Sequence, residues 1–329
     1  MIISVIGCGS SGQRYLSILK SLGISSELFG LRRNVEAPLA ETPYKYNLSD
    51  VNFTSYDGSV ISKSTHVIIS NTSQSHCSTY FWARNLNPHA RILIDKPIAI
   101  NATEFNSLSS TEDLNCFVGF QYRFSPLVKF LKTYFFKMLS ESRPMKIFIE
   151  HFDDVRSWHP WEDFQNSYSV LPELGGGCFN TLSHALDIAH FIFGSPDNHS
   201  LHLGTSSNYI SKCDDWYSAL LSYKMDSFRE YSVSVTAGYF SPFNSFQLRC
   251  ISDTESLTAD FLDDTLAIKR CDRVTINPHH GHYENVVLPE VHRSTLFSQM
   301  CKSFICYDLP CQLPTLYEIA CYNTIYYDR

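Results

Sequence analysis

The sequence predicts an α/β protein. An N-terminal Rossmann domain with a doubly wound parallel sheet precedes a C-terminal α+β domain with a large, mostly antiparallel, open-faced sheet. A glycine-rich turn separates an apolar run at residues 2–6 from a helical pattern. Strand-like and helix-like segments alternate up to about residue 120, which is typical of a parallel sheet. From about residue 200 to 296, apolar and polar residues alternate in strand-length runs, which indicates an antiparallel sheet with one covered face.

The first domain is assigned to residues 1–120. Its first helix contains Tyr15, Leu16, Leu19 and Leu22 and ends at the turn residue Gly23. Apolar runs predict strands at 2–6, 26–31, 65–70, 91–94 and 115–120, and further helices at 75–86 and 103–111. Ligands of such sheets bind beyond the carboxyl ends of the strands, where residues 70–72 and 95–97 fall.

The second domain is assigned to residues 121–329. A helix over 125–140 leads to a strand at 145–152, a loop, three glycines and a helix that ends near Phe193. Strand-like runs follow at 219–223, 231–235 and 246–251. An apolar and aromatic open face usually meets a partner, so we expect a homo-oligomer, either a homodimer or a homotetramer.

Residues 7–12 form the motif G-x-G-x-x-G at the point where the first strand turns into the first helix. Gly7 permits the tight turn, Gly9 lets a pyrophosphate approach the backbone, and Gly12 lets the helix pack against the strand. The helix start at Ser10 and Ser11 offers free N–H groups to phosphates. The sequence therefore predicts a dinucleotide site; the alternative is an ordinary turn between strand and helix.

The second strand bears on the choice of dinucleotide. An NAD site carries an acidic residue about 20 residues beyond the glycines, which binds the ribose 2′-hydroxyl. Arg32 and Arg33 stand there instead, and arginine binds phosphate in a bidentate manner. NADP(H) is favoured and NAD(H) stays possible; if both arginines are solvated loop charges, the choice stays open.

Composition narrows the class of protein. The chain has 329 residues, 44% hydrophobic residues and a net charge of −7, which suits two globular domains and offers no basic surface for nucleic acid. No apolar run approaches the roughly 18–20 residues that span a bilayer, and the N-terminus lacks the basic region of a signal peptide. We expect a cytoplasmic protein whose eleven cysteines are reduced thiols.

One cluster of residues resembles a metal site. His279, His280 and His282 follow the turn signal Asn277-Pro278 between strand-like runs. Three histidines within four residues do not converge easily on one ion without a further ligand. We interpret them as an exposed hairpin loop and expect no metal, with metal binding as the alternative.

Four segments together resemble the Gfo/Idh/MocA oxidoreductases, a family named after glucose–fructose oxidoreductase and inositol dehydrogenase. The segments are Asn71-Thr72-Ser73-Gln74-Ser75-His76, Asp95-Lys96-Pro97, Gly175-Gly176-Gly177 and His184-Ala185-Leu186-Asp187. They resemble the family's TPN…H, E-K-P and G-G-G…H-x-x-D motifs, with Asp95 in place of glutamate. The order and spacing of the segments along nearly the whole chain make the resemblance specific.

A loop points to one branch of the family. Trp158–Asp163, Ser167–Ser169 and Glu173–Gly175 resemble members associated with the synthesis of unusual surface-polysaccharide sugars. Tryptophan faces stack on sugars, while His159 and Glu162 offer hydrogen bonds to hydroxyls. The alternative for His159, Trp161 and Glu162 is packing within the loop.

The resemblance implies roles for several residues. Lys96 lies by the nicotinamide and the reacting carbon, where a cation stabilises a developing alkoxide. His184 moves the hydroxyl proton while hydride passes to or from the nicotinamide. Asp187 orients that imidazole or ties a helix to a strand, and Pro97 is expected to follow a cis bond. The cofactor contacts implied in addition are Asn71, Thr72, His76, Lys96 and Pro97. A surface charge at Lys96 and a core histidine at His184 are the structural alternatives.

The sequence departs from the family just before His184. Many members carry an aspartate three or four residues earlier, where this chain has Asn180 and Thr181. Neither residue can act as a base, although Asn180 could bind a substrate hydroxyl. Arg123 follows a strand end and either binds a substrate carboxylate or phosphate or joins the two domains. The substrate contacts expected are Arg123, His159, Trp161, Asn180, Thr181 and Asp187.

The resemblance implies an NAD(P)-dependent oxidoreductase that acts on a sugar, nucleotide-sugar or polyol. A reductase of a non-sugar carbonyl or imine is a second enzyme class that stays open. A catalytically silent NADP-binding regulator is a third, because the acidic residue near His184 is missing.

Overall fold

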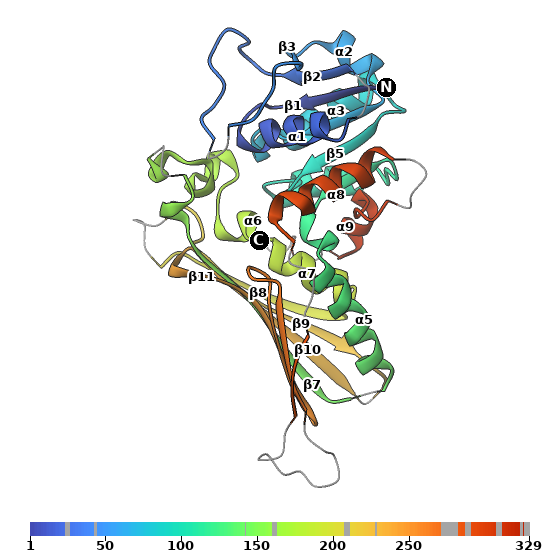
Figure 1. Cartoon of the computed structure of the whole chain (residues 1–329), viewed down its shortest axis with the longest axis vertical. Coiled ribbons are helices and arrows are strands. Elements are labelled where there is room, and N and C mark those ends of the chain that lie inside the picture. The colour runs from blue at the N-terminus through green and yellow to red at the C-terminus, as the bar shows by residue number, and fades with distance from the viewer. Residues whose placement is uncertain are drawn as a thin grey trace.

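The computed structural model describes residues 1–23, 27–42, 45–141, 143–159, 163–206, 211–227, 229–270, 282–286, 291–306, 311–322 and 325. The chain builds two sheets, one above the other in Figure 1, with helices between them. The α/β fold predicted from the sequence is confirmed.

The first sheet carries the glycine-rich turn. In the described part of the chain it has six strands in the order β3-β2-β1-β4-β5-β6, and all of its pairings are parallel. The strands are β1 (Ile2–Ile6), β2 (Glu27–Leu31), β3 (Asn52–Thr54), β4 (His66–Ile69), β5 (Arg91–Asp95) and β6 (Cys116–Gly119). The helices of this part are α1 (Ser10–Ser21), α2 (Gly58–Lys63), α3 (His76–Leu86) and α4 (Ala102–Ser109). Strand order reverses between β1 and β4, so the carboxyl ends of these strands are where a doubly wound sheet binds its ligand.

The second sheet is larger. In the described part it has eight strands in the order β14-β13-β12-β11-β7-β10-β9-β8, and only the β7–β10 pairing is parallel. The strands are β7 (Met145–Asp154), β8 (Asn198–Gly204), β9 (Trp216–Lys224), β10 (Glu230–Gly238), β11 (Phe240–Ser252), β12 (Glu255–Asp260), β13 (Thr265–Arg270) and β14 (His282–Val286). Short 3-10 helices complete the chain: η1 (Ser73–Ser75) follows β4, η2 (Gln121–Phe124) lies between β6 and α5, and four more lie between β7 and α6, namely η3 (Val155–Ser157), η4 (Phe164–Asn166), η5 (Tyr168–Val170) and η6 (Pro172–Leu174).

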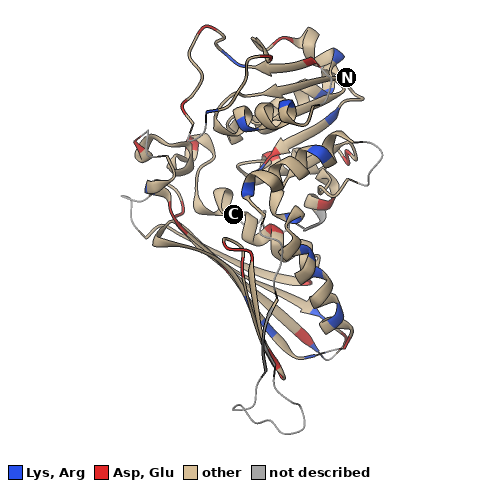
Figure 2. Ribbon diagram, viewed as in Figure 1, with Lys and Arg blue, Asp and Glu red and all other residues tan. Residues whose placement is uncertain are grey.

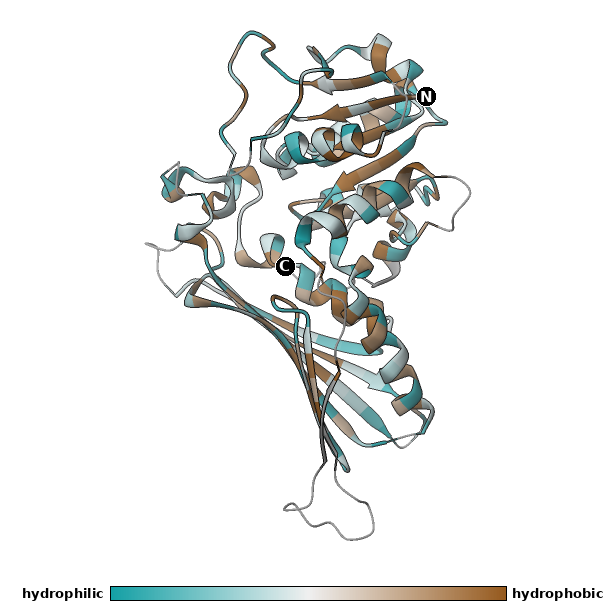
Figure 3. Cartoon of the chain, viewed as in Figure 1, coloured by the Kyte–Doolittle hydropathy of each residue, from teal (hydrophilic) through white to brown (hydrophobic). Residues whose placement is uncertain are grey.

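Helices cover one face of the second sheet, as its alternating sequence predicts (Figures 1 and 3). They are α5 (Pro126–Ser140), α6 (Cys178–Thr181) and α7 (His184–Phe193). Phe135 of α5 packs on Phe193 of α7 with ring centroids 5.0 Å apart, and Phe193 contacts Tyr223 of β9 at 6.1 Å. The covered face therefore forms the core of the second domain.

The opposite face of this sheet differs from the expectation of an apolar, aromatic surface. The aromatic rings of the strands over 217–246 lie mostly on the covered face, where Tyr217, Tyr223, Tyr231 and Phe246 are buried. On the open face, alternation leaves serines and threonines together with the rings of Phe148, Phe152 and Trp216. Leu220 and Ile251 are 41% and 46% exposed there. The period of two therefore leaves a mixed polar and apolar open face, and most rings of these strands lie on the covered face.

The end of the chain returns to the first sheet. Helices α8 (Arg293–Ile305) and α9 (Leu316–Tyr322) lie beside the N-terminal domain in Figure 1. The Phe297 ring of α8 contacts the Tyr15 ring of α1 edge-on, with centroids 5.9 Å apart. The backbone N–H of Val118 in β6 donates to the Pro314 carbonyl at 3.0 Å, an ordinary hydrogen-bond length. The end of the chain, which the sequence assigned to the second domain, thus packs on the first sheet. None of the described helices is long and apolar enough to span a bilayer.

Candidate active site

The glycine turn has the geometry that a dinucleotide needs. A Cβ on Gly7, whose φ is +93°, would lie 2.4 Å from the Asn71 backbone nitrogen, and one on Gly12 would lie 1.8 Å from the Gly7 carbonyl oxygen. A Cβ on Gly9 would meet nothing within 4 Å. Close packing therefore requires glycine at positions 7 and 12, while Gly9 leaves open space at the start of α1. Ser10 and Ser11 begin that helix, and no side chain caps it.

The end of β4 lies against this turn. The Asn71 amide donates to Thr79 Oγ1 at 2.8 Å, while its buried Oδ1 has no partner among the described residues. The two ring nitrogens of His76 lie 2.7 Å from the Pro97 carbonyl and 3.0 Å from the Asn71 carbonyl. His76 thus joins the ends of β4 and β5. Thr72 is exposed beside Asn71.

The two arginines predicted to recognise a 2′-phosphate follow β2 directly. Arg32 is half-buried and donates to the Pro38 carbonyl at 2.9 Å, whereas Arg33 is exposed. Burial raises the pKa of the Cys8 thiol to about 11, and the charge of Arg32 opposes this rise. Since Cys8 lies within the glycine turn, the charge of Arg32 lies near that turn.

Lys96 reaches from the first domain into the second. It follows β5 and precedes a cis peptide bond to Pro97, as the resemblance implied. Its Nζ donates to the Thr181 carbonyl at 2.5 Å. Burial lowers the pKa of Lys96 from 10.5 to about 8; the Arg293 charge lowers it too, while Asp95 opposes both. Lys96 is therefore a cation at neutral pH that is close to losing its proton.

His184 stands three residues beyond that carbonyl, at the start of α7. It is 4% exposed, its ring lies 5.0 Å from that of Tyr122, and its Nε2 lies 3.2 Å from the side-chain nitrogen of Gln121. Its Nδ1 is buried and has no partner among the residues that the structure describes. Burial, reinforced by the charge of Lys96, lowers the pKa of His184 well below 6.5, so the imidazole is neutral at pH 7.

Arg123 and Asp187 are engaged with each other. The guanidinium donates to the Asp187 carboxylate over 2.6, 3.0 and 3.1 Å, and each residue is 4% exposed. Burial raises the pKa of Asp187, and Arg123 partly offsets this rise. The pair joins η2 to α7, which favours the tether for both residues over contact with substrate or with His184.

Asn180 and Thr181 have structural contacts. The Asn180 amide donates to the carbonyls of Gly175 and Gly176 at 2.9 and 3.2 Å. The Thr181 hydroxyl bonds to the Gly177 carbonyl and to the Tyr239 hydroxyl. These bonds hold the glycine triplet and the end of α6, and so they position the Thr181 carbonyl that Lys96 contacts.

Part of the expected substrate loop is described. His159 lies near Tyr168, with ring centroids 6.3 Å apart. Trp161 and Glu162 lie outside the described residues, as do His279 and His280, and nothing is described of the His282 side chain. Among the residues described, no group of three or more His, Cys, Asp or Glu side chains lies together as metal ligands would.

Three further residues relate to this site. Gln121 contacts His184. His151 of β7 stacks on Phe246 at 4.0 Å, and its buried Nδ1 has no partner among the described residues. The charge of Arg293, the first residue of α8, lowers the pKa values of Lys96 and His184, and His151 acts on His184 as well. Gln121 follows the carboxyl end of β6 directly, so the strand-end rule could have found it. No local signal singles out His151 or Arg293, which come from distant parts of the chain.

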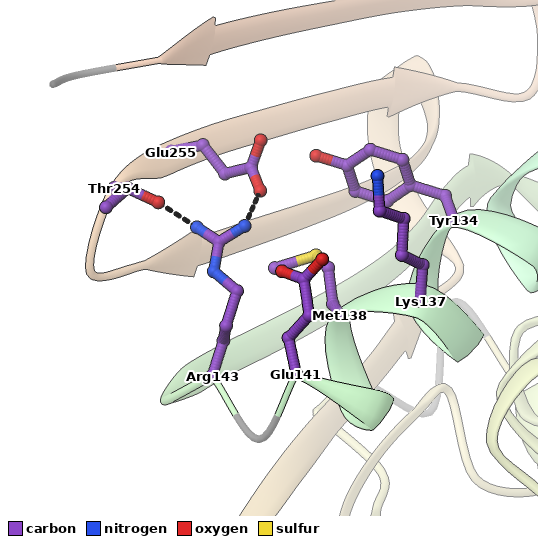
Figure 4. A pocket seen from close by; sticks show the side chains of 7 residues that line it. All are labelled: Tyr134, Lys137, Met138, Glu141, Arg143, Thr254 and Glu255. Carbon is purple, nitrogen blue, oxygen red and sulfur yellow. Dashed lines mark hydrogen bonds and ion pairs between the residues drawn. The ribbon is translucent and has the colours of Figure 1, made fainter. Parts of the chain in front are cut away.

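A separate hollow of about 250 Å³ lies between the end of α5 and the β11–β12 turn (Figure 4). It is lined by Tyr134, Lys137, Met138, Glu141, Arg143, Thr254 and Glu255. Arg143 pairs there with Glu255 and, at 3.2 Å, with Asp253. This guanidinium is neutralised, and the hollow shares no residue with the site described above.

Known proteins resemble this chain in one domain and in the overall fold. Residues 152–254 match the model of the oxidoreductase family C-terminal alpha/beta domain, GFO_IDH_MocA_C. No curated protein sequence matches the chain. Among solved structures, levoglucosan dehydrogenase in complex with NADH has a TM-score of 0.72 and 15% identity, covering 97% of this chain and 90% of that one.

Two further structures show the same likeness. UDP-N-acetylglucosamine 3-dehydrogenase GnnA from Acidithiobacillus ferrooxidans has a TM-score of 0.71 and 15% identity, covering 100% of this chain and 96% of that one. An NAD binding oxidoreductase from Klebsiella pneumoniae has a TM-score of 0.70 and 11% identity, covering 99% and 94%. At these identities the likeness establishes the fold alone. The family model, in turn, matches the part of the chain that forms most of the second sheet. The resemblance to the Gfo/Idh/MocA oxidoreductases stated from the sequence is thereby confirmed over residues 152–254, where the model of the family's C-terminal domain matches.

Proposed function

We propose that the protein is an NAD(P)-dependent oxidoreductase that transfers hydride between nicotinamide and a sugar, nucleotide-sugar or polyol. The observation that carries the proposal is the meeting of Lys96 and His184. The Lys96 ammonium, from the end of β5, lies on the Thr181 carbonyl three residues before His184. This brings a cation and a neutral imidazole together at the sheet edge that also carries the glycine turn.

The chain fits a nicotinamide dinucleotide. The open space at Gly9, the close contacts at Gly7 and Gly12, and the unpartnered Asn71 Oδ1 support binding of the pyrophosphate and its neighbouring groups at the start of α1. When bound, the nicotinamide supplies or takes up the hydride. The names of the similar structures, which include an NADH complex, support the same cofactor class.

Lys96 has the central role in the proton chemistry. A general acid or base works best when its pKa lies near the operating pH, and the pKa of Lys96, about 8, meets that condition. In the direction of reduction, its ammonium holds the developing negative charge on the substrate oxygen and gives it a proton. In the direction of oxidation, the amine takes the hydroxyl proton.

His184 stays neutral and positions the substrate. Burial makes its charged form costly, so it acts through hydrogen bonding. With the Gln121 amide donating to Nε2, the ring proton resides on Nδ1, which is then a donor to the substrate oxygen. If the Gln121 amide is turned by 180°, Nε2 carries the proton and Nδ1 becomes an acceptor. Gln121 therefore lets His184 serve a carbonyl or a hydroxyl.

Turnover tests the proposal. We expect the wild-type protein to change NADPH or NADH absorbance with at least one member of a panel of sugars, keto-sugars and nucleotide-sugars. Lys96→Met and His184→Ala should each lower turnover by ~10²–10⁴ and leave cofactor affinity nearly unchanged. A protein that binds cofactor and sugar together without hydride transfer would instead be the silent regulator that Asn180 and Thr181 leave open. Normal turnover in His184→Ala would remove His184 from the chemistry.

Between the two cofactors we favour NADP(H), because Arg32 lies beside the glycine turn and residues 31–34, at the end of β2, contain no carboxylate. Loss of a charged contact costs roughly 1.5–3 kcal/mol, about ten- to a hundredfold in affinity. Replacing Arg32 and Arg33 with alanine should weaken NADPH by that factor and leave NADH nearly unchanged in fluorescence titrations. Gly9→Val serves as the control, since it should abolish both. Equal weakening of both cofactors by the arginine variant would contradict recognition of a 2′-phosphate.

We further propose that the substrate is a sugar of surface-polysaccharide synthesis. This narrower proposal rests on the loop residues Trp158, His159 and Tyr168. A substrate panel for the assay should therefore include amino sugars and their nucleotide conjugates.

A further inference from the structure

Arg293 is a cation without a counter-charge. It begins α8, is exposed, and has no hydrogen bond or ion pair with another residue in the described part of the chain. Helix α8 carries positive residues near both of its ends in Figure 2, and it packs against α1 and η2. The segment before it is held to the second sheet, because the Val291 N–H donates to Asp264 at 3.1 Å. Arg293 thus stands at the junction of the two domains.

The charge of Arg293 acts on the proposed active site. Burial is the main cause of the lowered pKa values of Lys96, His151 and His184, and Arg293 lowers all three further. It also acts on the pKa values of Tyr122 and Asp153, which burial raises. These groups come from β5, β7, η2 and α7, so they surround a single region.

This region is the substrate side of the site. Helix α8, which Arg293 begins, packs against η2, and Gln121 of η2 contacts His184. His151 lies on the second sheet, far along the chain from the glycine turn, and stacks on Phe246. The position of Arg293 therefore fits a group on the substrate better than the cofactor pyrophosphate.

Uncompensated polar groups gather in the same region. The Lys96 ammonium contacts a carbonyl rather than a carboxylate. Within the described part of the chain, the buried Nδ1 atoms of His184 and His151 have no partners, and the two residues are 4% and 8% exposed. Buried polar groups are normally satisfied, so those left over indicate where a ligand binds. Two cations with two free ring nitrogens match a ligand that is rich in oxygen and negatively charged.

We propose that Arg293 determines substrate choice by binding an anionic group, a carboxylate or a phosphate, on the sugar. The inference rests on the proposed function, because it names the substrate class of the same site. A guanidinium binds either oxyanion in a bidentate manner, and the adjacent start of α8 favours negative charge as well. A neutral sugar leaves Arg293 unpaired and gains none of this attraction.

Direct binding tests the inference independently of catalysis. Glucose, glucuronate, glucose 6-phosphate and UDP-glucose are titrated calorimetrically into the protein saturated with NADPH. The first two differ in a carboxylate, and the last two present a monoester or a diphosphate, so the series also identifies the kind of anion. The variants are Arg293→Gln, Arg293→Lys and, as the matched control at the far end of the same helix, the exposed Lys302→Gln.

We expect at least one anionic member to bind more tightly than glucose. Arg293→Gln should weaken that member about ten- to a hundredfold, with glucose and NADPH changed less than about twofold. Arg293→Lys should restore part of the loss, and Lys302→Gln should match the wild type. Equal or tighter binding of glucose, no saturable binding of any anionic member, or unchanged binding in Arg293→Gln would overturn the inference. Failure of hydride transfer with every sugar would instead contradict the proposed function, whatever the binding shows.

Discussion

Replacement of Asp187 by asparagine should destabilise the protein far more than the loss of an ordinary surface ion pair. The variant keeps the shape of the side chain and removes its charge. Arg123, which is 4% exposed and donates over three contacts of 2.6–3.1 Å, would then be a buried cation without its carboxylate. Only the Phe120 and Phe191 rings, 5.9 and 5.1 Å from the guanidinium, would remain to compensate it.

The magnitude follows from burial. Breaking a buried pair from one side costs about 3–5 kcal/mol, because the remaining charge keeps its desolvation penalty. For a unit of about 200 residues this corresponds to a fall in Tm of about 6–20 °C. The double change of Arg123 to Met and Asp187 to Leu should cost far less, since burial already works against the charged carboxylate and raises its pKa. The control is Asp226→Asn in the exposed Asp226–Arg229 pair, where side chains are 38% and 54% exposed and a loss below about 1 kcal/mol is expected.

Thermal and urea unfolding followed by circular dichroism would measure these differences. A single variant that loses less than about 1 kcal/mol, or a double variant worse than the single, would refute the reasoning that Arg123 and Asp187 act as a buried tether.

Two further predictions concern pH and assembly. With its lowered pKa, Lys96 loses its charge as the pH rises through about 8 instead of 10.5. The value of kcat/KM for carbonyl reduction should therefore fall above about pH 8. A pH profile that falls only near pH 10 would contradict the role of Lys96. We also propose that the open face of the second sheet is the interface of a homo-oligomer, either a dimer or a tetramer. Light scattering should then give a mass of at least twice 37.6 kDa, and the double variant Leu220→Asp, Ile251→Asp should be a monomer. A monomeric wild type would contradict this proposal.

Local sequence patterns predicted several central strands of the first sheet well. The predicted strands at 2–6, 65–70 and 91–94 agree with β1, β4 and β5 to within one residue at each end, because each is a continuous apolar run of a buried parallel strand. Strand β3, with three residues, and helix α2, with six, were not predicted. Elements so short do not complete enough periods of two or of 3.6 to stand out from a loop.

The candidate site shows where such reasoning ends. Short motifs found Gly7, Lys96 and His184, since each follows the end of an element and shares a segment with other recognisable residues. They did not find that Arg123 and Asp187 neutralise each other, because a pair 64 residues apart has no local pattern. Likewise, nothing near Asn180 indicates that its amide is used by the backbone of the glycine triplet.

The structure also changes the meaning of the missing aspartate. In this chain the position of the Lys96 ammonium depends on a backbone carbonyl, that of Thr181, whose side chain is held by Tyr239 and Gly177. A carbonyl cannot titrate and offsets the lysine charge less than a carboxylate would. Burial therefore holds the pKa of Lys96 at about 8, with the charge of Asp95 opposing it, and the cation remains free for an oxygen that develops charge. Loss of a carboxylate next to His184 is thus compatible with chemistry that depends on Lys96, and it leaves room for a negative charge that arrives on the substrate.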